Sequence, residues 1–248
     1  MRKFEFSEFD EVGEETLQAI GKADRFNSWM YNTIKPWCTG EVLEIGSGAG
    51  NISKYFLNDN FKITLTDIRT NYCKPLEDKF SGSNSLTGVL KMDLADPDFE
   101  NKHRSLLGSF DTVFALNVVE HIENDDLSIL NSKKLLKPGG HLIILVPAYD
   151  ALYNKFDYRL GHYRRYTKSS LSKLLLQNKL DIIHNQYFNF AGILGWFISG
   201  NILRNSVIPV SQVNIFNDLV PVFRFVDRLL FNRMGLSTIA VGKNPVNQ

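Results

Sequence analysis

The chain has 248 residues, of which 44% are hydrophobic and 22% are charged, and its formal net charge is +1. This is the composition of an ordinary globular protein and excludes a largely disordered chain. A net charge so close to zero gives no support for binding to nucleic acid or to an anionic membrane.

Strand and helix patterns alternate through the first 150 residues. Short apolar or β-branched runs predict strands at 42–45, 62–66, 85–93, 110–116 and 141–147. Helical patterns are expected at 16–38, 49–59, 69–80 and 123–137, with Pro75 shortening the third and Pro-Gly-Gly ending the fourth. This alternation predicts an α/β fold with a doubly wound, mostly parallel sheet that has helices on both faces.

The second part of the chain adds a helix at 167–180 and two more strands, at 181–188 and 236–244, which makes seven strands. Two regions are not needed to complete the sheet. One is the polar, aromatic loop 147–167, and the other is the hydrophobic helical insertion 190–235 before the last strand. We expect specificity to be determined there.

Cys38 and Cys73 are the only cysteines, and the sequence has no Cys-x-x-Cys motif or Cys/His cluster. We therefore expect two reduced thiols, a cytoplasmic protein and no metal site. The N-terminal residues lack the apolar core of a secretion signal. The longest apolar stretch, 188–203, is interrupted by polar residues and is shorter than the ~20 residues that a membrane span needs.

A glycine-rich turn follows the first predicted strand, in which Glu44 precedes Gly46, Gly48 and Gly50. Glycines after a strand let the backbone turn tightly and let a ligand approach the main chain. A dinucleotide-binding turn places its third glycine three residues after the second, whereas here the interval is two. A P-loop is excluded because no Gly-Lys-Ser/Thr follows.

Five motifs in order resemble those of the class I S-adenosylmethionine (SAM)-dependent methyltransferases, over roughly residues 40–148. They are the glycine turn with Glu44, Asp67 at the end of the second strand, Asp93 in KMDLAD, Asn117 in FDTVFALNVVEHI, and the segment LLKPGGHLIILVP. The resemblance implies a Rossmann-like fold with SAM as the cofactor.

In this family the acid at the position of Asp67 holds the ribose hydroxyls, the acid at Asp93 lies near the adenine amino group, and Asn117 begins the loop beneath the methionine end. A carboxylate can accept hydrogen bonds from both ribose hydroxyls. The implied cofactor-binding residues are Glu44, Gly46, Ser47, Gly48, Gly50, Asp67, Ile68, Met92, Asp93, Leu94, Asn117 and Val118. The alternative is that Glu44 and Asp67 cap loops. For His121, capping or packing is favoured over chemistry.

Loop 147–167 follows the fifth strand at the carboxyl edge of the sheet, where such folds bind ligands. GHYRRY after LYNKFD resembles bacterial methyltransferases of sugar, lipid-linked and secondary-metabolite pathways. His162 is the candidate general base for a hydroxyl, with a structural hydrogen-bonding role as the alternative. The candidate acceptor-binding residues are Tyr149, Tyr153, Tyr163, Arg164, Arg165 and Tyr166. The two arginines could instead form structural ion pairs with Asp150 and Asp157.

The N-terminal segment 1–39 is expected to form a helical lid, with Trp29 and Tyr31 either over SAM or in the core. The insertion 190–235 contains an apolar helical stripe with Arg224, Asp227 and Arg228 away from it. The stripe consists of Leu219, Val222, Phe223, Val226, Leu229 and Leu230. Packing on the host domain is the favoured explanation, and a homodimer interface, an acceptor tunnel and a peripheral membrane contact are the alternatives.

The sequence thus predicts a single domain over 1–248, consisting of the lid 1–39, a SAM-binding core 40–148, the acceptor loop and sixth strand 149–189, the insertion 190–235, and the last strand and tail 236–248. The predicted function is transfer of a methyl group from SAM to a small-molecule or lipid-linked acceptor, with oxygen favoured over nitrogen or carbon. The basic stretch 159–173 is too isolated to indicate RNA. A non-catalytic SAM-binding partner subunit and an NAD-linked oxidoreductase are the rival hypotheses.

Overall fold

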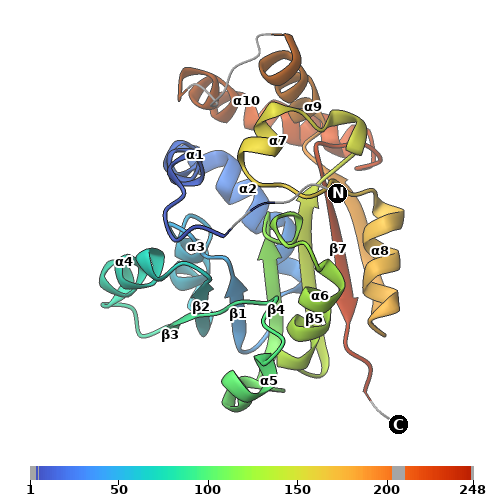
Figure 1. The fold of residues 1–248 in the computed structure, drawn as a ribbon. Coiled ribbons are helices and arrows are strands. Elements are labelled where there is room, and N and C mark those ends of the chain that lie inside the picture. Colours follow the sequence, from blue (N-terminus) through green and yellow to red (C-terminus); the bar gives the residue numbers. More distant parts are fainter. Residues whose placement is uncertain (1–3, 5, 203–209, 247–248) are drawn as a thin grey trace.

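The computed structural model describes residues 4, 6–202 and 210–246. Its centre is a seven-stranded sheet with the strand order β3-β2-β1-β4-β5-β7-β6 (Figure 1). The strands are β1 (Val42–Ile45), β2 (Ile63–Asp67), β3 (Leu86–Lys91), β4 (Phe110–Leu116), β5 (Leu136–Pro147), β6 (Asp181–Phe188) and β7 (Ser237–Lys243). β7 lies antiparallel between β5 and β6, and the other pairs are parallel, so the predicted sheet is confirmed.

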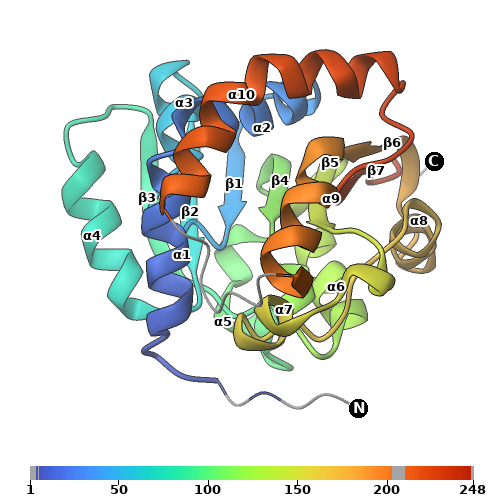
Figure 2. The ribbon, with the colours of Figure 1, turned by 90° about the horizontal axis from the view of Figure 1, so that it is seen from above.

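Helices cover both faces of the sheet, as Figure 2 shows from above. They are α1 (Glu11–Gly21), α2 (Asp24–Ile34), α3 (Ser53–Asn58), α4 (Thr70–Phe80), α5 (Phe99–Lys102), α6 (Asp125–Leu135), α7 (Lys155–Arg159), α8 (Lys168–Gln177), α9 (Phe190–Phe197) and α10 (Val210–Leu229). Neighbouring strand residues such as Val113 and Phe114 belong to two different core clusters, because successive side chains of a strand point to opposite faces. The first cluster packs against α6 and α8, and the second against α2, α3 and α10.

Three predicted elements differ in their boundaries. The single helix expected at 16–38 is two helices, because Ala23 has a non-helical backbone just after Gly21. Pro75 lies inside α4 and does not shorten it. The proline lacks an N–H group and so removes one hydrogen bond of the helix, which nevertheless continues to Phe80. β5 begins at Leu136, so Pro138-Gly139-Gly140 is part of the strand.

The orientation of α10 corrects part of the prediction for the insertion. Phe223 of the predicted packing stripe packs against the second core cluster. Leu219, Val222 and Leu229 of the same stripe are instead 43%, 56% and 61% exposed, whereas Asp227 is buried. The Asp227 carboxylate accepts hydrogen bonds from the backbone N–H groups of Asn189 (2.6 Å) and Phe190 (2.8 Å) at the start of α9. An acid placed there satisfies N–H groups that lack helical partners.

None of the described helices combines the length and the hydropathy that crossing a membrane requires.

Candidate active site

The glycine turn after β1 needs glycine at all three positions. Gly46, Gly48 and Gly50 have φ angles of +70°, +51° and +73°, a region that residues with a Cβ rarely adopt. A Cβ on Gly46 would lie 2.5 Å from Cγ2 of Val118, and one on Gly48 would lie 3.0 Å from Cδ1 of Leu17. The turn is therefore closely packed from both sides.

Asp67 connects the end of β2 to this turn. Its Oδ2 accepts a hydrogen bond from the Gly48 N–H and its Oδ1 one from the Arg69 N–H, each at 2.9 Å. Burial raises the pKa of this carboxyl group. The capping role considered from the sequence is thus present. It leaves lone pairs on both oxygens for a ligand, because a carboxylate can accept about four hydrogen bonds.

Glu44 is buried at the end of β1, and the Ser53 hydroxyl donates to its Oε2. Burial raises the pKa of Glu44 to about 8, and the charge of Asp67 adds to the effect. A buried carboxyl group with a raised pKa ionises more readily when a cation lies beside it. The ammonium group at the methionine end of SAM is such a cation.

The remaining predicted cofactor residues lie at the same carboxyl edge of the sheet. Ser47 is buried, and its Oγ accepts from the Thr66 N–H at 3.2 Å. Asp93 is half-buried and accepts from the Ala95 N–H at 2.8 Å. The other five differ in exposure: Met92 and Leu94 belong to the core, Ile68 and Val118 are half-buried, and Asn117 is exposed with a φ of +55°. The side chains of Met92 and Leu94 therefore anchor the segment that carries Asp93 to the core.

Helix α1 covers the glycine turn. The Leu17 side chain packs toward Gly48, and the Asn51 amide donates to the Leu17 carbonyl at 3.0 Å. Trp29 and Tyr31 of α2, expected either over SAM or in the core, are buried in the core, where the centre of the Trp29 ring lies 4.4 Å from that of Phe188. The sequence gives no sign that Leu17 contacts the glycine turn, because one leucine in an amphipathic helix carries no functional signal.

The loop after β5 is organised around a buried ion pair. Asp157 Oδ1 lies 2.8 Å from Nδ1 of His162 and 2.8 Å from Nε of Arg165, and its Oδ2 accepts from the Asn154 N–H at 2.9 Å. Burial lowers the pKa of His162, and these two partners hold the pKa of Asp157 below its usual value. Both shifts indicate a neutral imidazole that donates from Nδ1 to an ionised carboxylate, which leaves Nε2 as an acceptor.

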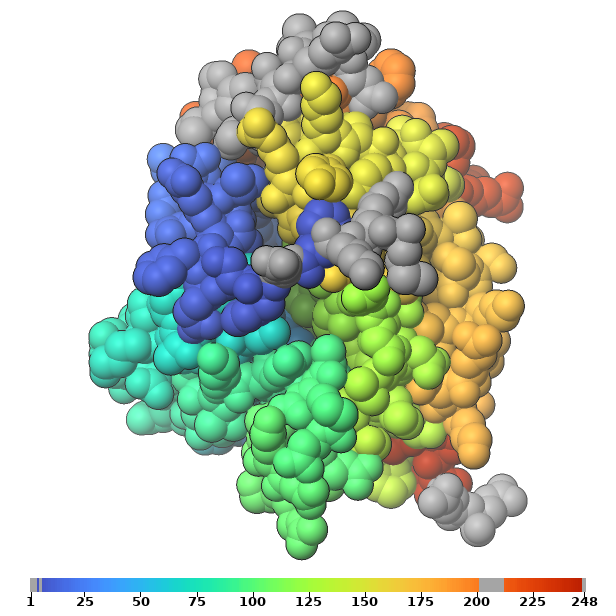
Figure 3. All heavy atoms as spheres, viewed as in Figure 1, coloured from blue at the N-terminus to red at the C-terminus, as the bar shows by residue number. Residues whose placement is uncertain are grey.

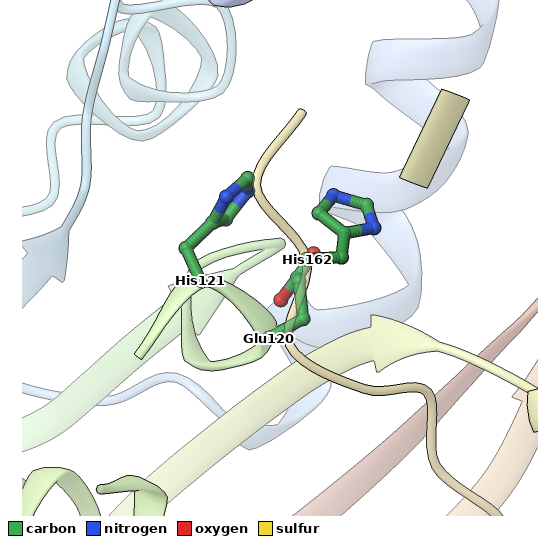
Figure 4. Close-up of side chains that lie close together, drawn as sticks. All are labelled: Glu120, His121 and His162. Atoms are coloured by element: carbon green, nitrogen blue, oxygen red, sulfur yellow. The ribbon is translucent and has the colours of Figure 1, made fainter. Parts of the chain in front are cut away.

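Three side chains converge beside this pair (Figure 4). Glu120 and His121 belong to the short 3-10 helix η3 (Val119–His121) after β4, and His162 comes from the loop after α7. The rings of His121 and His162 are 4.6 Å apart at 84°. The ligating atoms of the three side chains all lie within 4.8 Å of one another. We call these residues the Glu-His-His cluster.

The members of the Glu-His-His cluster have perturbed acidities. Burial raises the pKa of Glu120 to about 8, with the charge of Asp157 contributing. The His121 side chain is exposed, yet desolvation by the surrounding protein lowers its pKa well below its usual value. The nearby His162 lowers it further. In the space-filling view a recess opens on this face, between the N-terminal helices and the segments that follow β4 (Figure 3).

Two predicted acceptor contacts have structural partners instead. Arg165 is buried, donates to Asp157 and to the Ala148 carbonyl at 3.0 Å, and lies 4.7 Å from the ring of Trp196. Tyr166 is buried and donates to Asp125 at 2.8 Å. These polar groups are engaged inside the protein, and for Arg165 the partner Asp157 is the structural alternative that the sequence left open.

The other four predicted acceptor contacts are half-buried near the cluster. Arg164 forms an ion pair with Asp125 at 2.8 Å. The Tyr153 hydroxyl donates to the His162 carbonyl at 2.8 Å, and the Tyr149 ring stacks on that of Tyr187. The Tyr163 hydroxyl donates to the Phe4 carbonyl at 3.2 Å, which brings the N-terminal segment over the loop. Tyr153 and Tyr163 thus lie next to His162.

The chain matches a sequence model of the methyltransferase domain family over residues 43–142. It is 29% identical over 155 residues to the lovastatin diketide synthase mokB of Monascus pilosus, an alignment that spans 58% of this chain and 6% of the synthase.

Among solved structures, a putative methyltransferase of Haloferax volcanii, in complex with the Trm112 methyltransferase activator, has a TM-score of 0.65 at 14% identity over 98% of this chain and 99% of that one. Phosphoethanolamine N-methyltransferase 2 of Haemonchus contortus, in complex with SAM, has a TM-score of 0.60 at 17% identity over 89% and 52%. At such identities the likeness concerns the fold alone. The ordered motifs, the matching family model and the shared fold together identify residues 43–142 as a domain of the class I SAM-dependent methyltransferase family, whose cofactor is SAM.

Proposed function

We propose that this methyltransferase acts on a hydroxyl group of a small-molecule or lipid-linked acceptor. The observation that carries the proposal is the acceptor nitrogen Nε2 of His162, which Asp157 orients by its bond to Nδ1. His162 belongs to the Glu-His-His cluster, next to the loop that starts at Asn117 beneath the expected methionine end of SAM.

The chemistry of methyl transfer explains why such a group matters. The methyl group leaves a positively charged sulfonium in an in-line displacement, so the protein mainly aligns the acceptor and excludes water. A hydroxyl is a poor nucleophile until it loses its proton, and a positioned side chain can assist that step. His162 as the proton acceptor, predicted from the sequence, remains a proposal.

The proposed cofactor contacts follow from the same geometry. Asp67 would accept hydrogen bonds from the ribose hydroxyls, Asp93 would bind the adenine amino group, and Glu44 would face the ammonium group of the methionine end. Gly46 and Gly48 let the backbone approach the ligand.

Exposed apolar side chains of α9 and α10 support a lipid-linked acceptor. They are Leu194, Phe197, Leu219, Val222, Phe225 and Leu229. The Trp196 indole donates to the Leu152 carbonyl at 3.2 Å, which joins α9 to the acceptor loop. Exposed apolar side chains on a helix that contacts the acceptor loop suit the chain of an amphiphilic substrate. A homodimer that covers these side chains is the competing explanation.

Calorimetric titration with S-adenosylhomocysteine, with NADH as the control, tests the cofactor site first. Turnover of [methyl-²H₃]SAM with hydroxylated acceptors, with and without a lipid tail, then tests the acceptor class by mass spectrometry of the product. Methylation at nitrogen or carbon would contradict the proposed acceptor atom. S-adenosylhomocysteine binding without turnover of any acceptor, together with copurification of a second methyltransferase subunit, would favour the non-catalytic partner.

A further inference from the structure

We propose that the Glu-His-His cluster binds a divalent first-row transition metal ion, with Zn²⁺ as the best fit. A second step rests on the hydroxyl acceptor of the proposed function and assigns the activation of that hydroxyl to the ion in place of His162: the bound ion takes the acceptor hydroxyl as a further ligand. The sequence predicted no metal site, because His121 and His162 lie 41 positions apart and no ligand-spacing motif connects them.

The donor set is suited to such an ion. Two imidazole nitrogens and one carboxylate oxygen lie within 4.8 Å of one another, and this combination binds Zn²⁺ and Fe²⁺ in catalytic sites that keep a position open. With ligand distances of about 2.0–2.2 Å, donor atoms around a tetrahedral Zn²⁺ are about 3.4 Å apart. Small rotations of the three side chains would therefore close the site. Mg²⁺ and Ca²⁺ fit poorly, because they prefer oxygen ligands throughout.

His162 is oriented as a metal ligand usually is. A ligating histidine donates its second N–H to a carboxylate or a backbone carbonyl, which fixes the ring and its tautomer. His162 donates from Nδ1 to Asp157 at 2.8 Å, and Asp157 is held in turn by Arg165. The ring of His162 thus keeps Nε2 for a ligand.

Glu120 provides an independent observation. It is 0% exposed, and neither of its carboxyl oxygens has a hydrogen-bond partner among the described residues. A buried carboxyl group that makes no hydrogen bond is unfavourable in either protonation state, and in its ionised state it needs a counter-charge at this position. A trapped water could satisfy one oxygen but supplies no charge. A cation bound to Glu120, His121 and His162 satisfies all three groups.

The ion would also supply the activation that a hydroxyl acceptor needs. Coordination lowers the pKa of a bound hydroxyl, so that its proton passes to solvent. The resulting alkoxide oxygen forms a bond to the methyl carbon as the carbon–sulfur bond of SAM breaks, which leaves S-adenosylhomocysteine. In this arrangement His162 is a metal ligand and not the general base.

Metal binding is measured first, independently of activity. The full chain is stripped with a chelator and dialysed, then titrated with Zn²⁺ in competition with a chromophoric chelator, and the bound metal is counted by elemental analysis. We expect one Zn²⁺ per chain, and at least about 10-fold weaker binding in Glu120→Gln and His121→Ala, since each variant removes one of three protein ligands. His103→Ala, which removes a histidine outside the cluster, should bind Zn²⁺ as the wild type does.

Titration with S-adenosylhomocysteine shows whether each variant keeps a folded cofactor site. Equal Zn²⁺ affinity in the wild type and in folded Glu120→Gln and His121→Ala would overturn the metal site, whatever the acceptor proves to be. Loss of methyl transfer on chelation and its return with Zn²⁺ would support the second step. If stripped enzyme and His121→Ala keep full turnover while His162→Ala loses it, the ion has no role in transfer and His162 acts as the base.

Discussion

His162 and Arg165 share one oxygen atom of Asp157, with both contacts at 2.8 Å inside the protein. The exposed fractions of the three residues are 6%, 6% and 0%. The shared carboxylate sets the direction of the His162 ring and neutralises the buried guanidinium. The loop that is expected to hold the acceptor is therefore ordered by a buried ion pair and a buried hydrogen bond, and its stability should depend on the Asp157 carboxylate that makes both.

Asp157→Asn should lower the free energy of unfolding by about 3–5 kcal/mol, because it leaves the Arg165 charge buried without its partner. Urea denaturation at pH 7 measures the effect. Asp78→Asn removes an exposed partner of Lys74 and should change stability by less than about 1 kcal/mol. If both variants behave alike, the buried pair is not what orders the loop.

Asp67→Asn should weaken S-adenosylhomocysteine binding by about 10- to 100-fold, since hydrogen bonds to a charged group contribute about 1.5–3 kcal/mol. Isothermal titration calorimetry measures the affinity. The amide keeps an oxygen for the Gly48 N–H, so the turn should stay folded, and circular dichroism checks this. Normal affinity in the folded variant would mean that Asp67 only caps the turn.

Gly46→Ala should destabilise the protein by about 1–3 kcal/mol, because alanine is strained at a φ of +70° and its Cβ would meet Val118. Gly88→Ala in β3 is the matched control, since its Cβ would meet nothing within 4 Å and its φ is not positive. It should leave stability unchanged or slightly higher. Thermal unfolding of the two variants separates the demands of the turn from a general effect of replacing glycine.

Local patterns were sufficient to predict most of the fold. Each strand was marked by an apolar run, and the start of α8 by Thr167, which forms a capping box with Ser170. The orientation of α10 was not predictable, because this helix has apolar side chains on its outer face and Asp227 on its inner face. Hydrophobic periodicity predicts that a helix forms. It does not predict which face of the helix packs against the core when both faces carry apolar and polar side chains.

The candidate site divides in the same way. Asp67 and Asp93 could be placed because each lies at or just after a strand end within a motif of the family that the sequence resembles, and strand ends meet at one edge of a parallel sheet. Glu120 gave no such signal, because the resemblance assigns it no role and an acid outside a strand usually faces solvent. Its burial depends on the chain returning at Tyr163, whose N–H donates to the Glu120 carbonyl at 2.8 Å. A contact between segments so distant in the sequence leaves no trace in either segment.

Glu44→Gln should have opposite effects on the free energy of unfolding and on cofactor affinity at high pH. The pKa of Glu44 is raised from 4.5 in the unfolded chain to about 8 in the folded protein. Between these values the folded state holds a proton that the unfolded state has lost, so the wild type becomes less stable as the pH rises from 4.5 to 8. Glutamine does not titrate, and the variant lacks this loss.

Urea denaturation without cofactor should therefore show the stability of Glu44→Gln increasing relative to the wild type by at least about 1 kcal/mol between pH 5 and pH 8, as a shift of several pKa units allows. S-adenosylhomocysteine should nevertheless bind the variant less tightly at pH 8, where the wild-type carboxylate can face the ammonium group. A stability difference that stays constant over this pH range would show that Glu44 is already ionised without ligand.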